Sequence, residues 1–118
     1  MLKLKTVKNL KQKNYDGLLW DFKKGETVYL TARCIKNSMG NWGLMCSPNG
    51  LMPFSAFPFS TVVLIYKRKN YDFFMREKIG KKCFLYAKTK TDEVLKITEI
   101  NGEIVVEEMK LKDIEPIF

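Results

Sequence analysis

Histidine is absent from this 118-residue chain, and its three cysteines are odd in number with no Cys-x-x-Cys spacing. These absences exclude the ordinary zinc site and a disulfide framework, and the thiols favour a reducing, cytoplasmic compartment. The sequence also lacks a Gly-x-Ser-x-Gly elbow and a phosphate-cradling glycine loop, so most acid–base, nucleophilic and metal-dependent reactions lack their parts. Lysine and tyrosine chemistry needs no motif and stays open. We expect a protein that is not an enzyme and uses no cofactor and no metal.

Long apolar runs are missing as well. The longest, Phe57 to Tyr66, is about half of what a bilayer span needs and contains Pro58. Lysines interrupt the first dozen residues, which argues against a secretory signal. Apolar residues nevertheless make up 46% of the chain and aromatic residues 13%, which is typical of a folded protein. We therefore expect one domain and no membrane partner.

The cysteines lie among apolar residues of predicted strands, as small core residues do: Cys34, Cys46 and Cys83. The alternative is a reactive thiol at Cys83, because Lys81 and Lys82 precede it. The core interpretation is the simpler of the two, since no paired spacing links the three thiols.

Alternating apolar residues are the main structural signal. From Thr27 to Ile35 apolar residues alternate with the period of a half-buried strand. Thr61 to Tyr66 is a continuous β-branched and apolar run, which is typical of a strand covered on both faces. Asn101-Gly102 lies between two β-rich runs and is the strongest hairpin signal in the chain. The sequence therefore predicts a mainly β fold.

One short helix is predicted after the basic triplet at residues 67–69. Asn70 is a suitable cap, and Tyr71, Phe74 and Met75 share one face at helical spacing. Gly80 fits a C-terminal stop. The predicted helix covers Tyr71 to Lys78.

The stretch from Leu19 to Tyr66 combines several turn signals in order. Phe22-Lys23-Lys24-Gly25-Glu26 enters a strand, and Trp42 follows the next turn. Gly50-Leu51-Met52-Pro53 then precedes a Ser-x-aromatic segment. Together these pieces resemble a Src-homology-3 (SH3)-type barrel, in which they are the diverging turn after the long first loop and the approach to a short three-ten turn. The resemblance covers residues 5–66 and implies a small barrel that binds partners and does not catalyse.

The predicted organisation has two parts in one fused unit. Residues 1–66 form the SH3-like barrel, and residues 67–118 form a short helix and a β-hairpin extension packed on it. The packing is inferred from the run Thr61 to Tyr66, which is apolar on both faces, whereas a strand of an isolated barrel has one solvent-exposed face. A homodimer that covers this face is the alternative. In the resembled family the long loop carries acidic residues that grip the arginine of proline-rich peptides. This chain has Lys8, Lys11 and Lys13 there, so it departs from that mode of recognition.

The charge of the chain is strongly asymmetric around a net value of +8. Residues 61–90 have nine cations against two carboxylates, and residues 91–118 have three against eight. A basic surface attracts nucleic acid or an acidic protein, and phosphate contacts make that attraction dependent on salt. The acidic C-terminal segment either pairs with the lysines or repels nucleic acid from one side. A solvated lysine-rich surface without a partner is the plain alternative.

Two binding functions follow, and both are non-catalytic. In the first, a basic face engages nucleic acid, a nucleoprotein complex or an acidic protein surface, with aromatic side chains stacking on single strands. Its cations are Lys67, Arg68, Lys69, Arg76, Lys81 and Lys82, and its stacking candidates are Tyr15, Tyr29 and Phe54. In the second, the chain is a small protein-binding adaptor or an inhibitor that sterically blocks a larger nucleic-acid enzyme, such as a host defence nuclease. In this second function the chain resembles proteins of phages and mobile elements in its small size and its lack of catalytic motifs.

Overall fold

The computed structural model describes residues 2–14, 16–32, 35, 43–47 and 55–114, and their side chains except those of residues 43–47, 55 and 56. The N-terminal strands are β1 (Leu2–Thr6), β2 (Leu10–Lys13), β3 (Leu19–Phe22), β4 (Thr27–Leu30), β5 (Gly43–Ser47), β6 (Ser55–Pro58) and β7 (Val62–Tyr66). The C-terminal strands are β8 (Lys69–Ile79), β9 (Lys82–Lys88), β10 (Glu93–Ile100) and β11 (Glu103–Lys110). Two three-ten turns, η1 (Phe59–Thr61) and η2 (Leu111–Asp113), follow β6 and β11.

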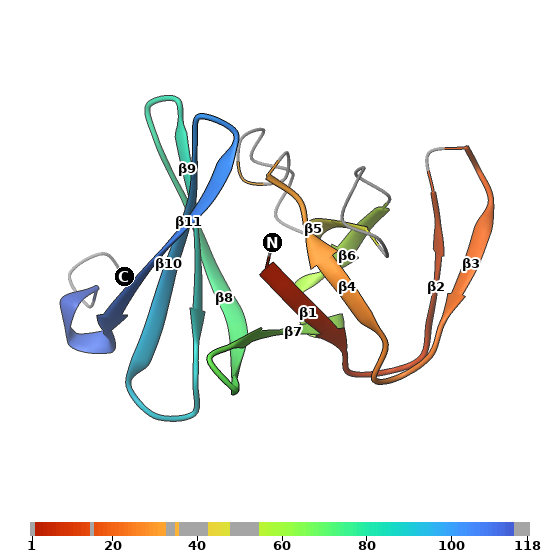
Figure 1. Ribbon diagram of the computed structural model, residues 1–118, viewed down its shortest axis with the longest axis horizontal. Coiled ribbons are helices and arrows are strands. Elements are labelled where there is room, and N and C mark those ends of the chain that lie inside the picture. The colour runs from red at the N-terminus through yellow and green to blue at the C-terminus, as the bar shows by residue number, and fades with distance from the viewer. Residues whose placement is uncertain (1, 15, 33–34, 36–42, 48–54, 115–118) are drawn as a thin grey trace.

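The strands form one large antiparallel sheet and one separate hairpin (Figure 1). The large sheet has the order β11-β10-β9-β8-β7-β1-β4-β5-β6, and β2 pairs with β3 alone. The mainly β prediction is therefore confirmed. Within the described ranges the sheet is open, because its end strands β11 and β6 do not pair with each other. The predicted SH3-like barrel is not confirmed.

Strand β1 lies between β4 and β7 and shows the clearest alternation. Leu2, Leu4 and Thr6 are buried, while Lys3 and Lys5 are exposed. Successive side chains of a strand point to opposite faces, so the Leu-Lys-Leu-Lys-Thr pattern separates a core face from a charged face. The two lysines consequently lie on the same outer face of the sheet.

Strand β4 is shorter than the predicted segment from Thr27 to Ile35. It ends at Leu30, and the described residues Ala32 and Ile35 have helical backbone. Leu30 pairs with Leu2 on β1 and with Cys46 on β5, and the described pairing of β4 ends at this residue. The alternation of apolar residues in the sequence continues to Ile35, so it predicted a longer strand than the pairing forms.

The predicted helix from Tyr71 to Lys78 is wrong, because these residues lie within β8. Tyr71 and Phe73 are both buried, which is the alternation of a strand. The pairing register with β9 then shifts between Phe73 and Met75, which marks a β-bulge at Phe74. A bulge adds one residue to a strand, so it reproduced the three- and four-residue spacing of a helix.

Strand β7 connects the N-terminal and C-terminal parts of the sheet. It pairs with β1 along one edge and with β8 along the other. Val62 and Leu64 are buried, whereas Val63 and Ile65 are only half-buried. One face of this strand is therefore covered, where the sequence predicted two.

Two apolar clusters hold the sheet together. The main core includes Leu4, Leu64, Tyr71 and Leu95, which come from both parts of the chain. A smaller cluster lies on the other face of the C-terminal strands, where Ile114 packs against Tyr86 and Val94. Along the described stretches, no helix has the length and apolar character needed to cross a bilayer.

Candidate anionic-partner interface

The six predicted cations do not gather at one place. Lys67 and Arg68 form the turn between β7 and β8, and Lys69 begins β8. Lys81 and Lys82 lie beyond the other end of β8. That strand has 11 residues, which corresponds to a length of roughly 30 Å. Arg76 lies between these ends, half-buried and with contacts of its own.

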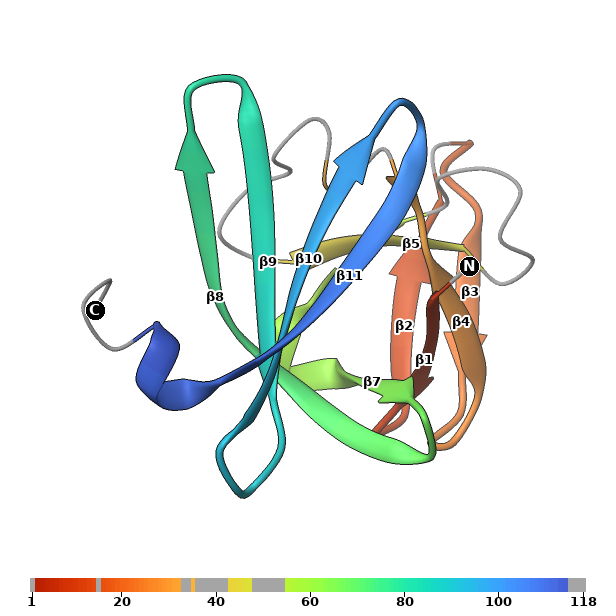
Figure 2. The same cartoon turned by 60° about the vertical axis from the view of Figure 1, so that its left-hand side comes forward.

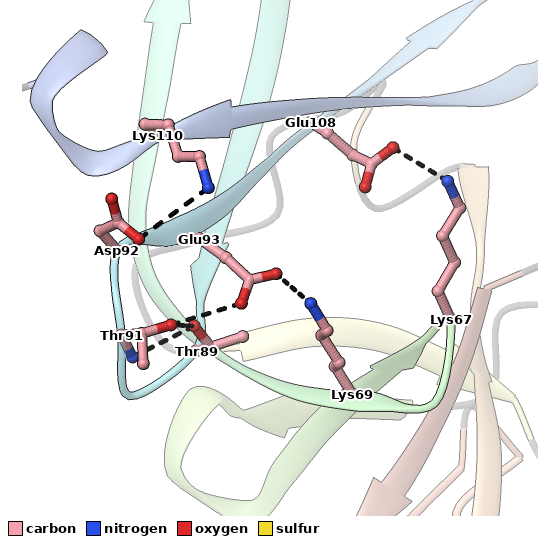
Figure 3. A network of polar contacts seen from close by, with 8 residues as sticks. All are labelled: Lys67, Lys69, Thr89, Thr91, Asp92, Glu93, Glu108 and Lys110. Atoms are coloured by element: carbon pink, nitrogen blue, oxygen red, sulfur yellow. Dashed lines mark hydrogen bonds and ion pairs between the residues drawn. The ribbon is translucent and has the colours of Figure 1, made fainter.

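Two of the three cations near the β7–β8 turn, Lys67 and Lys69, are bound to carboxylates of β11 and β10 (Figure 3). The Lys67 ammonium donates to Glu108 Oε2 at 3.0 Å, and the Lys69 ammonium donates to Glu93 Oε2. Glu93 also accepts a hydrogen bond from the Thr91 hydroxyl at 3.4 Å. Of the two roles predicted for the acidic segment, internal pairing is therefore observed here.

These contacts change the acidity of the paired groups. The hydrogen bond to Glu108 and the attraction of its charge raise the pKa of Lys67 above its ordinary value. The hydrogen bond to Glu93 raises the pKa of Lys69, and the same contact lowers the pKa of Glu93. A phosphate that approached these two lysines would meet a charge that is already partly compensated and a repelling carboxylate beside it.

The other end of β8 has a different environment. Lys81 and Lys82 line a small surface hollow together with Glu99 and Asn101 of the β10–β11 turn region. Glu99 accepts a hydrogen bond from the backbone N–H of Gly102, so its carboxylate is held in place there. The positive charge at this end therefore also lies beside a carboxylate.

Of the three stacking candidates, only Tyr29 falls within the described residues; Tyr15 and Phe54 lie outside them. Tyr29 is half-buried on β4. Its register partner on β1 is Lys3, and Lys3 is also the partner of Ile65 on β7. Residues directly opposite in an antiparallel pair project to the same face about 5 Å apart. The structure therefore places Tyr29 beside a lysine on an outer sheet face.

Lys5 belongs to the same outer face of β4, β1 and β7, which we call the β1 face. It is opposite Thr27 on β4 and Val63 on β7. Both Lys3 and Lys5 are exposed, and neither forms an ion pair in the part of the chain that the structure describes. Sequence reasoning missed both lysines, although their alternation with Leu2 and Leu4 was the available signal.

A second surface that the sequence did not single out is the tip of the β2–β3 hairpin. Leu18, Leu19 and Trp20 are consecutive and are 61%, 59% and 44% exposed. The Asn14 side-chain oxygen accepts hydrogen bonds from the backbone N–H groups of Asp16 and Leu18, both at 2.9 Å, and orders the turn. Figure 1 shows the hairpin projecting beside the large sheet.

Other chemical features are few among the described residues. They contain no group of three or more histidine, cysteine, aspartate or glutamate side chains arranged to hold a metal ion. Cys83 is a buried free thiol, as the core interpretation predicted, whereas the side chains of Cys34 and Cys46 lie outside the described residues, as does Trp42. No protein-family model, no curated protein and no solved structure matches this chain.

Proposed function

We propose that this chain is a non-catalytic binding protein that engages nucleic acid, or a nucleoprotein complex, through the β1 face. One observation carries the proposal: the half-buried Tyr29 lies directly beside the exposed Lys3 on the outer face of the sheet, and the exposed Lys5 is two residues farther along β1. A lysine neutralises a phosphate, and an aromatic ring stacks on an unpaired base of any sequence. We therefore expect single-stranded nucleic acid to bind more tightly than a duplex does.

The state of the other cations supports this choice of surface. Lys67 and Lys69 hold carboxylates of the chain itself, so their charge is already compensated. Lys3 and Lys5 have no such compensation within the described ranges. The net positive charge is also larger on residues 1–66, which have nine cations against three carboxylates, than on residues 67–118, which have twelve against ten.

The test is fluorescence anisotropy of labelled single-stranded and duplex DNA and RNA, titrated from about 50 to about 200 mM salt. We expect Lys3→Gln with Lys5→Gln to weaken binding and to lower the slope of log K against log salt by about 1 to 2. Tyr29→Leu should weaken single-strand binding about tenfold, because one stacked base contributes about 1–3 kcal/mol.

The matched control is Lys67→Gln with Lys69→Gln, which removes the same two charges from the carboxylate-bound pair. This control should leave the salt slope within about 0.5 of the wild-type slope. Equal effects of the two double variants would contradict the β1 face. Absence of binding even at the lowest salt would contradict nucleic acid as the partner altogether.

A second candidate function is a small protein-binding adaptor or an inhibitor that blocks a larger nucleic-acid enzyme. The exposed Leu18, Leu19 and Trp20 favour it, because consecutive large apolar side chains on an ordered turn are typical of protein contacts. Lys11 and Lys13 on the adjacent strand suit an acidic protein surface. Salt-dependent nucleic-acid binding distinguishes the first candidate from this one.

The proposal also includes an SH3-like arrangement of the N-terminal strands and a cytoplasmic location. An SH3-like arrangement of residues 1–66 is supported by the β2–β3 hairpin in the position of the long first loop and by η1 directly before β7. The Gly25 backbone, with φ of 89°, forms the tight turn that enters β4. A cytoplasmic location rests on the odd number of cysteines, and a homodimer stays an alternative for the half-buried face of β7.

A further inference from the structure

The outer face of the C-terminal strands is covered at one end by the chain itself. The inner face of these strands packs into the main core through residues such as Leu85 and Ile97. On the outer face Ile114, just after η2, is completely buried against Tyr86 and Val94. Figure 2 shows η2 at the opposite end of the strands from the β10–β11 turn.

The end near the β10–β11 turn has no such cover within the described residues. Ile100 is 46% exposed and Val105 is 39% exposed, and both line a mainly apolar groove with the half-buried Phe84 and Thr98. We call this the distal groove. It continues the same face on which Ile114 is buried, so one end of the face is filled and the other is open.

Two cations border the distal groove. Lys82 lines it directly, and the Lys96 ammonium lies 4.5 Å from the centre of the Phe84 ring. Glu107 also lines the groove and is opposite Lys96 in the pairing of β10 with β11. Cations therefore outnumber carboxylates among the lining residues, and the apolar floor lies between them.

We propose that the distal groove binds a short segment of a partner protein in which one aliphatic side chain is flanked by aspartate or glutamate. The chain itself provides the precedent for the aliphatic side chain, because Ile114 fills the corresponding position at the other end of the face. A partner's aliphatic side chain covers Ile100 and Val105, which removes apolar surface from water. Its carboxylates meet Lys82 and Lys96, which fixes the chemistry of the partner.

This inference is independent of nucleic-acid binding through the β1 face, since it uses other residues, all of them on β9, β10 and β11. The test starts from random octapeptides displayed on phage and selected against the full chain. Peptides that also bind the variant Ile100→Ser with Val105→Thr are removed by counter-selection. We expect the enriched peptides to contain isoleucine, leucine or valine within two positions of aspartate or glutamate.

Synthetic versions of the enriched peptides are then titrated against single variants. Val105→Thr should weaken binding about tenfold, because the valine contributes buried apolar area. Val7→Thr is the matched control, since Val7 is 37% exposed and lies on the N-terminal part; it should leave the affinity unchanged. Lys82→Glu should weaken the acidic peptides and, in a repeated selection, enrich lysine and arginine instead.

Three outcomes overturn the proposal. The first is that no peptide depends on Ile100 and Val105. The second is that the enriched peptides lack carboxylates or are insensitive to Lys82→Glu. The third is that Val105→Thr changes the molar mass of the free chain in sedimentation equilibrium, which would assign the groove to a second copy of this chain.

Discussion

At the scale of single residues, Tyr86 links the stability of the fold to alkaline pH. Its side chain is completely buried, and its hydroxyl donates to Glu77 Oε1 at 3.2 Å. Burial, reinforced by the charge of Glu77 and by this hydrogen bond, raises the pKa of Tyr86 to about 12. The folded state therefore holds the phenolic proton more tightly than the unfolded chain does.

We predict that the free energy of unfolding falls between pH 10 and pH 12. The raised pKa of Tyr86 stabilises the fold below pH 10. This contribution is lost as the pH rises through about 12, where the folded state also releases the phenolic proton. The loss that Tyr86 contributes is about 2–3 kcal/mol, since a tenfold change in acidity between the folded and unfolded states corresponds to about 1.4 kcal/mol. Urea denaturation at a series of pH values measures it.

The comparison variant is Tyr86→Phe, which keeps the ring and removes the titrating group. Its stability at neutral pH should be lower by about 1 kcal/mol because the hydrogen bond to Glu77 is lost. Its decline above pH 10 should be shallower than that of the wild type. Parallel pH profiles for the two proteins would show that the phenol of Tyr86 is equally acidic in the folded and unfolded states.

At the scale of elements, two hairpins of the same kind are connected by very different residues. The β10–β11 turn uses Asn101 and Gly102, with φ of 53° and 84°. The β7–β8 turn uses Lys67 and Arg68, with φ of 49° and 65°. Positive φ at both central residues is the geometry that favours Asn-Gly, so the Lys-Arg turn is strained.

We predict that Arg68→Gly stabilises the protein by about 0.5–1 kcal/mol in urea denaturation. A non-glycine residue with left-handed backbone costs about 1–2 kcal/mol, and the freedom of glycine in the unfolded chain offsets about 0.5–1 kcal/mol of that gain. The reciprocal variant Gly102→Arg should destabilise by about 1 kcal/mol, since no atom lies within 4 Å of the added Cβ and only the backbone is strained. Stabilisation by both substitutions would contradict this explanation.

These two turns also show which elements a sequence reveals. Asn101-Gly102 predicted its hairpin, and that prediction is confirmed by the pairing of β10 with β11. Lys67-Arg68 carries no turn signal, so the hairpin of β7 and β8 went unpredicted. The bulge at Phe74 then imitated helical spacing, because local periodicity does not distinguish an inserted strand residue from a helical turn.

At the scale of the whole molecule, the pairing of β7 with β8 makes one continuous sheet of the N-terminal and C-terminal parts. The main core crosses this junction, because Leu4 and Leu64 share it with Leu95. The same arrangement brings the basic segment around β8 against the acidic segment of β10 and β11, as in the pair of Lys67 with Glu108. Two of the nine cations of residues 61–90, Lys67 and Lys69, are therefore paired with carboxylates of the acidic segment among the described residues.

We predict that the chain unfolds as one cooperative unit. Leu64 is completely buried at the junction, so Leu64→Ala should destabilise by about 2–5 kcal/mol. The slowest-exchanging amides of β1 and of β10 should lose the same protection free energy in native-state hydrogen exchange. A loss confined to β1 would show that the two parts open independently.

Local sequence patterns were sufficient for the mainly β class and the hairpin at Asn101-Gly102, because these depend on alternation and turn chemistry within a few residues. Which cations are compensated follows from the three-dimensional arrangement alone, since Lys69 and Glu93 are distant in the chain and meet through the pairing of β8, β9 and β10. The placement of Tyr29 beside Lys3 and the open distal groove likewise follow from strand order and register. Those long-range pairings depend on packing across the whole sheet, which no local pattern encodes.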